Sequence, residues 1–292
     1  MKHIIWLPSY PKSGNTWLRI IISSLFFSKD GKFENFDFLE IDKFDRFKYF
    51  EFIKKINTED YDLIFNNKEF NEKSFLTYFK YSLQAQKNLY QKDNFLFFKT
   101  NNARTKIKDH YYTNETTTLG FIYLIRDPRD IIVSYSKHLN RDIDFTIDML
   151  LNTQLHGKDK KDFSFPELLL GWENHYLSWK NFSKVPNLFL RYEDFLLDVE
   201  SQINEIINYL YENFKIKISN KKEKIDNIIK YTRIENLRKL EKNIGFAETS
   251  SKSKSLFFRK GMSGQWKNIL SKNQEKQIIN KFSNTMNLFG YS

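Results

Sequence analysis

Residues 4–22 read IIWLPSYPKSGNTWLRIII, and this stretch decides the fold. It begins with an apolar run from Ile4 to Leu7 and continues through a turn that contains Pro, Ser and Gly. A helical pattern of apolar residues starts near Thr16. The order of a short buried strand, a glycine-containing loop and a helix predicts the first unit of an α/β fold.

Three further apolar runs predict additional buried strands, at about residues 95–98, 119–125 and 187–190. None of the three alternates with polar residues, and helical stretches separate them. Strands of this kind lie in parallel sheets whose two faces are covered. We therefore expect a three-layer α/β fold with a central parallel β-sheet flanked by helices. The expected helices cover about residues 16–25, 74–90, 131–138, 167–181, 195–211, 221–231, 234–242 and 272–287.

Composition limits the class of protein. The 292 residues carry a formal net charge of +11 and include no Cys, which excludes a disulfide scaffold, thiolate zinc sites and thiol nucleophiles. No apolar run reaches the roughly 18 residues that a membrane helix needs. The apolar stretch at residues 4–8 is too short for the core of a signal peptide, so we expect a cytoplasmic protein with no membrane span.

The basic residues are spread along the whole chain, so we expect most Lys side chains to be solvated and no nucleic-acid partner. Neither an internal repeat nor a domain linker is evident, which predicts a single domain over residues 1–292. Residues 31–71 have weak periodicity and predict an irregular, partly helical insertion. The Ser- and Lys-rich stretch from Thr249 to Ser255 predicts a mobile segment.

Cationic and polar side chains follow the predicted strands. Lys12, Lys99, Arg126 and Tyr192 each come just after an apolar run. If the strands are parallel, their carboxyl ends meet at one edge of the sheet, where α/β proteins bind ligands. These four residues therefore predict an anion site at that edge.

The first loop has the composition of a phosphate or sulfate site. Gly14 permits a tight turn before the helix, whose first amides carry partial positive charge. Lys12 adds a full charge, and Ser13 and Thr16 add hydroxyl donors. The loop lacks the Walker A pattern. An ordinary strand-to-helix turn capped by Ser13 or Asn15 is the alternative.

Residues 10–17, YPKSGNTW, resemble the 5′-phosphosulfate loop of sulfotransferases that use 3′-phosphoadenosine 5′-phosphosulfate (PAPS). That loop reads Tyr-Pro-Lys-Ser-Gly-Thr-Thr-Trp, so this chain differs only at Asn15. The resemblance implies a P-loop-like fold, PAPS as co-substrate and the 3′,5′-bisphosphate (PAP) as product. It implies nucleotide contacts for Lys12, Ser13, Gly14, Asn15, Thr16 and Trp17. For Trp17, a place in the protein core is an equal alternative.

A second strand-to-helix junction, residues 124–135 (LIRDPRDIIVSY), resembles the 3′-phosphate motif of the same family. Asp127 and Pro128 are explained by helix capping. Arg126 and Ser134 are not, and a guanidinium with a hydroxyl two helical turns away suits a second phosphate. The resemblance implies that both hold the 3′-phosphate.

A C-terminal loop and two single residues complete the resemblance. Residues 259–266, RKGMSGQW, are similar to the family's Arg-Lys-Gly-x-x-Gly-Asp-Trp clamp, with Gln265 in place of Asp. The match implies that Arg259, Lys260 and Gly261 contact the 3′-phosphate. Tyr192, within Tyr-Glu-Asp, and Thr232, within a segment near the adenine, are also implied as cofactor contacts.

The catalytic pattern breaks at Asn101. In the family, a Lys-Thr-His or Lys-Ser-His sequence ends the second strand and its His is the general base; here the residues are Lys99-Thr100-Asn101. An amide cannot accept that proton. Either another group is the base, with His138 and His110 as candidates, or the acceptor needs little base help, or the protein binds the nucleotide without activity. His138 also fits an ordinary half-exposed helical residue.

We expect in-line transfer of a sulfuryl group from PAPS to an acceptor hydroxyl or amine on a small molecule or glycan. Lys12 would stabilise charge on the bridging oxygen and Lys99 would position the sulfuryl group, and no metal is implied. Residues 31–94 and 140–162 would wall the acceptor pocket. A P-loop kinase, a nucleic-acid-binding protein and an inactive PAPS- or PAP-binding protein are the competing classes. The acceptor and the oligomeric state are not fixed by the sequence.

Overall fold

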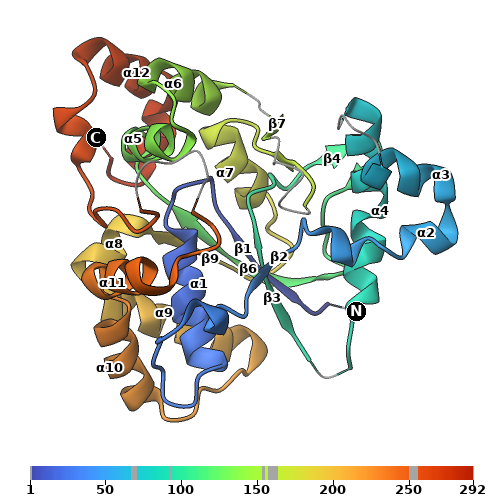
Figure 1. Ribbon diagram of the computed structural model, residues 1–292, viewed down its shortest axis with the longest axis horizontal. Helices are drawn as coiled ribbons and strands as arrows, with labels where there is room; N and C mark the ends of the chain where they lie inside the picture. The colour runs from blue at the N-terminus through green and yellow to red at the C-terminus, as the bar shows by residue number, and fades with distance from the viewer. Residues whose placement is uncertain are drawn as a thin grey trace. The chain divides into compact units, whose positions relative to one another are not determined.

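The computed structural model describes residues 2–66, 71–92, 94–152, 155–156, 164–249 and 256–291 (Figure 1). The chain divides into two compact units, and each of them brings together segments that are distant in the sequence. Unit 1 consists of Met1–Tyr10, Asp42–Tyr123 and Thr153–Asn187, and unit 2 of Pro11–Ile41, Leu124–Asn152 and Leu188–Ser292.

A five-stranded sheet with the order β2-β3-β1-β6-β9 is the framework of the fold. Its central strand β1 (Ile4–Pro8) is buried along its whole length. β1 pairs in parallel with β3 (Leu96–Thr100), from Ile4 opposite Leu96 to Pro8 opposite Thr100, and on its other side with β6 (Thr118–Ile125). β2 (Asp42–Lys43) pairs in parallel with β3, and β9 (Asn187–Arg191) is the last strand. The prediction of an α/β fold with a central parallel sheet is confirmed.

Unit 1 packs aromatic side chains around its strands. Trp6 of β1 is fully buried, and its ring contacts Phe44, Phe98 and Trp179. The other elements of this unit are η2 (Phe47–Tyr49), α2 (Ile53–Ile56), α3 (Thr58–Tyr61), η3 (Asp62–Asn66), α4 (Glu72–Asn88), β4 (Lys106–Ile107), β5 (His110–Tyr111), β7 (Leu155–His156), β8 (Glu167–Leu168) and α7 (Trp172–Lys180).

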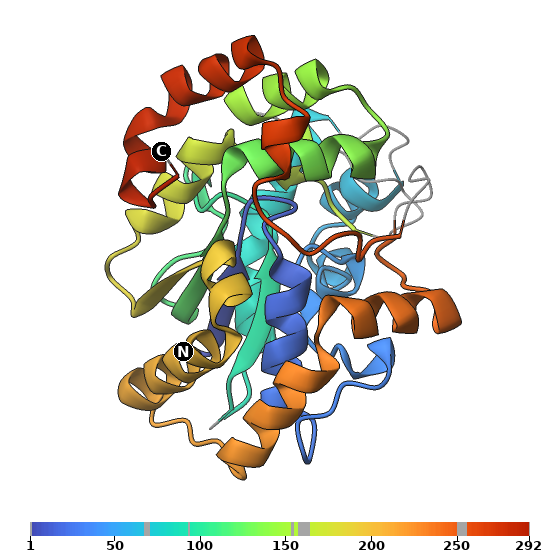
Figure 2. The same ribbon diagram turned by 90° about the vertical axis from the view of Figure 1, so that its left-hand side faces the viewer.

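Unit 2 is mainly helical. Helices α5, α6 and α12 lie side by side in Figures 1 and 2, and α1 lies next to α10. A core cluster of Ile20, Phe33, Leu237 and Phe258 ties α1 to α11 and to the C-terminal loop. The elements are α1 (Asn15–Phe26), η1 (Phe36–Phe38), α5 (Pro128–Leu139), α6 (Ile143–Leu151), α8 (Tyr192–Leu197), α9 (Val199–Phe214), α10 (Lys221–Tyr231), α11 (Ile234–Ile244), η5 (Gln265–Asn268) and α12 (Lys272–Leu288).

Two of the predicted helices were wrong. The helix expected over 167–181 begins only at Trp172, because Gly171 has φ 73° and the preceding residues form strand β8. The helix expected over 195–211 is two helices, since the Asp198 side chain caps a new helix by accepting from the Ser201 amide. Strand β3 also runs past Lys99 to Thr100. Residues 250–255 of the segment predicted to be mobile lie outside the described residues.

Candidate functional site

The first loop adopts the strained backbone that a glycine-containing anion loop needs. Lys12 has φ 69° and Gly14 has φ 98°, both in the left-handed region. Gly14 is the N-cap of α1; its carbonyl accepts from the Trp17 amide (2.9 Å), but it has no side chain that could accept from the earlier amides of the helix. A Cβ at Gly14 would lie 2.4 Å from the Tyr192 ring. Only glycine fits this position without displacing that ring.

Arg126 joins the first loop to the C-terminal loop. Its Nη1 donates to the Lys12 carbonyl (3.0 Å) and its Nη2 donates to the Met262 carbonyl (3.1 Å). The guanidinium lies 4.3 Å over the ring of Tyr192. Its Nε is buried and has no hydrogen-bond partner among the described residues, and the same is true of Ser13 Oγ. Both atoms are therefore available to donate a hydrogen bond to a bound anion.

A second guanidinium lies near the first. Burial lowers the pKa of Arg259, and the positive charge of Arg126 lowers it further. Two partly desolvated cations that repel one another are stabilised when an anion binds beside them. Gly261 brings its loop close to α11, because a Cβ there would lie 2.7 Å from Ile234. Lys260 is exposed.

Asp130 of α5 fixes the rest of the C-terminal loop. Its carboxylate accepts from the amides of Gly264 (2.6 Å) and Trp266 (3.3 Å). Asp127 caps the same helix by accepting from the Arg129 amide, and Pro128 occupies the first turn, as the sequence predicts. α5 therefore positions the loop that contains Arg259. The same helix begins two residues after Arg126.

Trp17 and Thr232 meet in unit 2. The Trp17 Nε1 donates to the Thr232 hydroxyl at 3.0 Å, across 215 residues of sequence. The Trp17 ring makes an edge contact with Tyr192 and a tilted contact with Phe195, with centroids 6.1 and 5.7 Å away. Trp17 is half-buried. The residues implied to lie near the adenine are therefore neighbours in unit 2.

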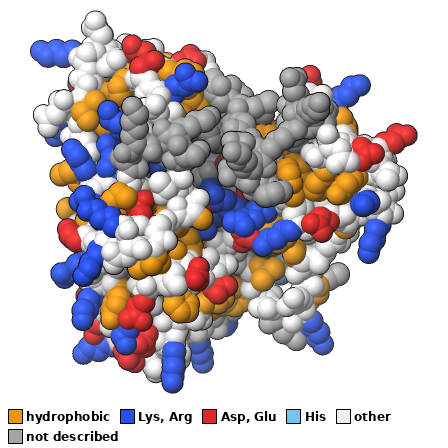
Figure 3. Space-filling model, in the orientation of Figure 1, with side chains coloured by type: hydrophobic (Ala, Val, Ile, Leu, Met, Phe, Trp, Pro, Cys, Tyr) orange, Lys and Arg blue, Asp and Glu red, His pale blue; other side chains and the backbone are white. Residues whose placement is uncertain are grey.

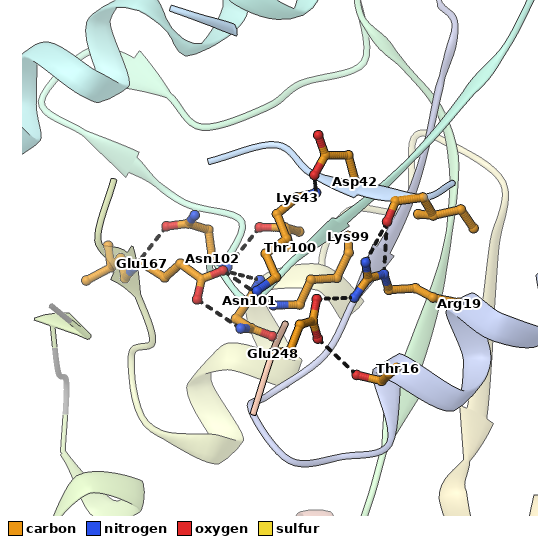
Figure 4. A network of polar contacts seen from close by, with 12 residues as sticks. Thr16, Arg19, Asp42, Lys43, Lys99, Thr100, Asn101, Asn102, Glu167 and Glu248 are labelled. Carbon is orange, nitrogen blue, oxygen red and sulfur yellow. Dashed lines mark hydrogen bonds and ion pairs between the residues drawn. The ribbon is translucent and has the colours of Figure 1, made fainter. Parts of the chain in front are cut away.

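Glu248 is a site residue that the sequence analysis missed. Its carboxylate accepts from the Thr16 hydroxyl (3.3 Å) and pairs with the Arg19 Nη1 (2.7 Å) (Figure 4). Arg19 is also held by the Ile41 carbonyl. A carboxylate thus contacts the first turn of α1, which is where the sequence predicts an anionic ligand.

Phe257 connects two of the predicted catalytic side chains. The Lys12 Nζ lies 4.2 Å from the centre of its ring, a cation–π contact. His138 on α5 is half-buried, and its ring meets the edge of Phe257 at a centroid distance of 6.3 Å. Ser134 lies one turn before His138 on α5.

A polar cluster in unit 1 surrounds Asn101. The Glu167 carboxylate accepts from the Asn101 backbone amide (3.1 Å) and from its Nδ2 (2.9 Å), and lies 3.7 Å from the Lys99 Nζ (Figure 4). His175 Nε2 donates to the Asn101 carbonyl (2.9 Å), and its Nδ1 is 2.8 Å from the Tyr123 hydroxyl. Burial lowers the pKa of His175 to about 4, so the ring is neutral near pH 7.

Thus the predicted residues lie in two groups. Unit 2 contains all the predicted nucleotide contacts together with His138, and unit 1 contains Lys99 and Asn101. His110, the other candidate base, lies in the β4–β5 hairpin opposite Ile107. Glu167 and Glu248 were missed because no local pattern marks a carboxylate that contacts a distant loop.

The charged side chains on the face of the molecule in Figure 3 are mixed in sign. Figure 3 shows Lys and Arg side chains interspersed with acidic and uncharged side chains on the face in view. Within the described part of the chain, no three His, Asp or Glu residues are grouped as a metal site would require. No helix among the described residues is long and apolar enough to cross a membrane.

Comparisons with known proteins point to one family. A family model described as a sulfotransferase domain matches residues 2–290. The chain is 25% identical to an amine sulfotransferase of Oryctolagus cuniculus, over 98% of this chain and 81% of the relative. It is 25% identical to a flavonol 3-sulfotransferase of Flaveria bidentis, over 94% and 78%. It also resembles the crystal structure of a retinol dehydratase in complex with androsterone and the inactive cofactor PAP, with a TM-score of 0.59 and 20% identity over 97% of this chain and 80% of the other.

Proposed function

Because this chain belongs to the sulfotransferase domain family, we propose that it transfers a sulfuryl group from PAPS to a hydroxyl or amine of a small molecule and releases PAP. The observation that carries this proposal is the position of Arg126. It joins the first loop to the C-terminal loop, and its buried Nε has no partner among the described residues. The 3′-phosphate, which PAPS carries and ATP lacks, would satisfy that donor.

The first loop would bind the 5′-phosphosulfate. Lys12, Ser13, Gly14, Asn15 and Thr16 supply an ammonium, a buried unpartnered hydroxyl, and the first amides of α1. The match of residues 10–17 to the family's phosphosulfate loop supports this assignment. Glu248 would have to release Thr16 as the nucleotide enters, because two anions cannot share that hydroxyl favourably.

The remaining nucleotide contacts follow from the two other loops. Arg126 and Arg259 would hold the 3′-phosphate with their guanidinium groups, and the phosphate would offset the burial and the mutual repulsion that lower the pKa of Arg259. Ser134, Lys260 and Gly261 are assigned to the same phosphate from the motif matches alone. Trp17, Tyr192 and Thr232 would border the adenine, supported by the contacts among these three side chains.

Transfer itself would depend on charge stabilisation. In the proposed reaction the acceptor oxygen or nitrogen bonds to sulfur, and the bond between sulfur and the bridging oxygen breaks. Lys12 would stabilise the charge that develops on that oxygen, and Lys99 would position the sulfuryl group. His138 is the candidate proton acceptor of unit 2, since its ring and the Lys12 ammonium both contact Phe257.

The acceptor class is proposed from the relatives. Two of them are named for amines and flavonols, which supports a small-molecule acceptor over a glycan. We keep residues 31–94 and 140–162 as the proposed walls of the acceptor pocket and residues 1–292 as one functional domain. A relative named cytosolic sulfotransferase 14, from Arabidopsis thaliana, supports a cytoplasmic location.

The test is turnover with PAPS and a panel of phenols, flavonols, aliphatic alcohols, amines and oligosaccharides, read by mass spectrometry. We expect PAP release and a sulfated product with at least one acceptor. Tight binding of PAP without any product would instead favour the alternative that Asn101 suggests, a protein that binds the nucleotide and has no transferase activity. Product with ATP and magnesium but not with PAPS would contradict the proposal in favour of a kinase.

A further inference from the structure

Three of the four hydrogen-bonding groups of Asn101 are already engaged. Its backbone amide and Nδ2 donate to the two oxygens of Glu167, and its carbonyl accepts from His175. The fourth group, Oδ1, accepts no hydrogen bond from the described residues. Asn101 itself is 9% exposed. The one group left to meet another molecule is therefore the amide oxygen.

Glu167 decides which end of the amide faces outward. A carboxylate can only accept hydrogen bonds, so the Asn101 side chain must turn its NH₂ toward Glu167 and its oxygen away. The Glu167 side chain is 1% exposed and lies 3.7 Å from the Lys99 ammonium, which offsets its charge. Figure 4 shows Lys99 and Asn101, which are separated by Thr100 in the chain, both close to Glu167.

We propose that Glu167 is a positioning residue: it fixes Asn101 so that Oδ1 accepts a hydrogen bond from the nucleophilic O–H or N–H of the acceptor. This inference rests on the proposed sulfotransferase function and adds a role for two residues that the motif matches leave unassigned. The hydrogen bond orients the lone pair of the nucleophile toward sulfur and does not remove its proton. The acceptor must therefore carry hydrogen on its nucleophilic atom.

Four titratable side chains surround Glu167: Lys99, His175, Tyr78 and Tyr112. Burial lowers the pKa of His175 to about 4 and raises the pKa of both tyrosines above their usual range. His175 and the two tyrosines therefore keep a constant, neutral charge near neutral pH.

The test compares Asn101→Ala, Glu167→Gln and the double variant, with Glu173→Gln on α7 as the matched control. Glutamine can donate to Oδ1 and thereby turn the Asn101 amide around. We expect each single variant to lower kcat about 10–100-fold with unchanged Kd for PAP, and the double variant to lose no more than either single. Additive losses would overturn the inference. An Asn101→Ala variant with unchanged kcat would overturn it as well, and that result can be obtained even if Glu167→Gln fails to fold.

The pH dependence of the Asn101→His variant is a further test, because Glu167 would not affect it if its role were purely structural. Burial and the Lys99 ammonium would lower the pKa of an imidazole at this position, and the Glu167 carboxylate would raise it relative to the Glu167→Gln background. Its activity should then fall as the pH drops below that pKa, and adding Glu167→Gln should shift the fall to lower pH. A profile that Glu167→Gln does not shift contradicts the inference. Wild-type protein without turnover would overturn the proposed function as well, whereas wild-type turnover with unaffected variants overturns only this inference.

Discussion

The Arg126 guanidinium donates to the Lys12 carbonyl at 3.0 Å, which ties the loop after the first strand to the loop after β6. The same side chain reaches Met262 in the C-terminal loop. Arg126→Gln should therefore weaken binding of PAP by about 1.5–3 kcal/mol, the usual value for a hydrogen bond to a charged group. Titration calorimetry measures this, with Arg46→Gln as an exposed-arginine control. An equal loss in both variants would contradict the assignment.

Lys12→Ala should affect turnover far more than nucleotide affinity. If the ammonium stabilises charge that appears only in the transition state, kcat should fall about 10²–10³-fold. PAP affinity should change much less, because the loop amides remain. Steady-state kinetics and calorimetry on the same preparation separate the two effects. Lys29→Ala, an exposed lysine of unit 2, is the control, and unchanged kcat for Lys12→Ala would remove its catalytic role.

Glu248→Gln should tighten nucleotide binding. The carboxylate contacts Thr16 and must leave when a phosphate binds at the first turn of α1. Removing its charge should lower the Kd for PAP about two- to fivefold, the range expected for one charge at a helix N-terminus. Glu235→Gln, an exposed change in the first turn of α11, should leave the Kd unchanged. Weaker binding by Glu248→Gln would show that the carboxylate supports the site.

Gly14→Ala tests whether the loop needs glycine because Tyr192 leaves no room for a side chain, in addition to the positive φ of this residue. Its Cβ would lie 2.4 Å from Tyr192, whereas a Cβ at Gly245, which also has positive φ, meets nothing within 4 Å. Both variants bear the conformational cost, about 1–2 kcal/mol of unfolding free energy. Only Gly14→Ala should in addition lose PAP affinity. Equal behaviour in urea unfolding and in calorimetry would refute the close packing of the loop on Tyr192.

Whether a contact could be predicted from the sequence depends on how far apart in the sequence its two residues lie. The turn at Lys12 and Gly14 and the helix cap at Asp127 depend on residues only a few positions away in the sequence. The first strand, its loop and the cap of α5 could therefore be predicted. The Glu248 contact with Thr16 spans 232 residues and the Glu167 contact with Asn101 spans 66. No periodicity or cap marks such carboxylates, because tertiary packing alone brings them to their partners. The same holds for β8, where pairing with β7 overrides the helical pattern of residues 167–181.

His175 should make stability depend on pH. Its folded pKa of about 4 lies below the unfolded value of about 6.5, so the unfolded state binds the extra proton first. The contribution is complete above about pH 6.5 and is lost as the pH falls toward 4, by about 3 kcal/mol in total. Urea unfolding of wild type and His175→Asn at pH 7 and pH 4.5 measures it. A difference between the two proteins that stays constant with pH would contradict the buried neutral ring.

The most direct test of the central claim is titration calorimetry of the wild-type protein with PAP and with AMP. If Arg126 and Arg259 form a second phosphate site, PAP should bind about 10–100-fold more tightly than AMP, since the two nucleotides differ only in the 3′-phosphate. Arg126→Gln should remove most of that difference. Equal Kd values for PAP and AMP in the wild-type protein would contradict the account.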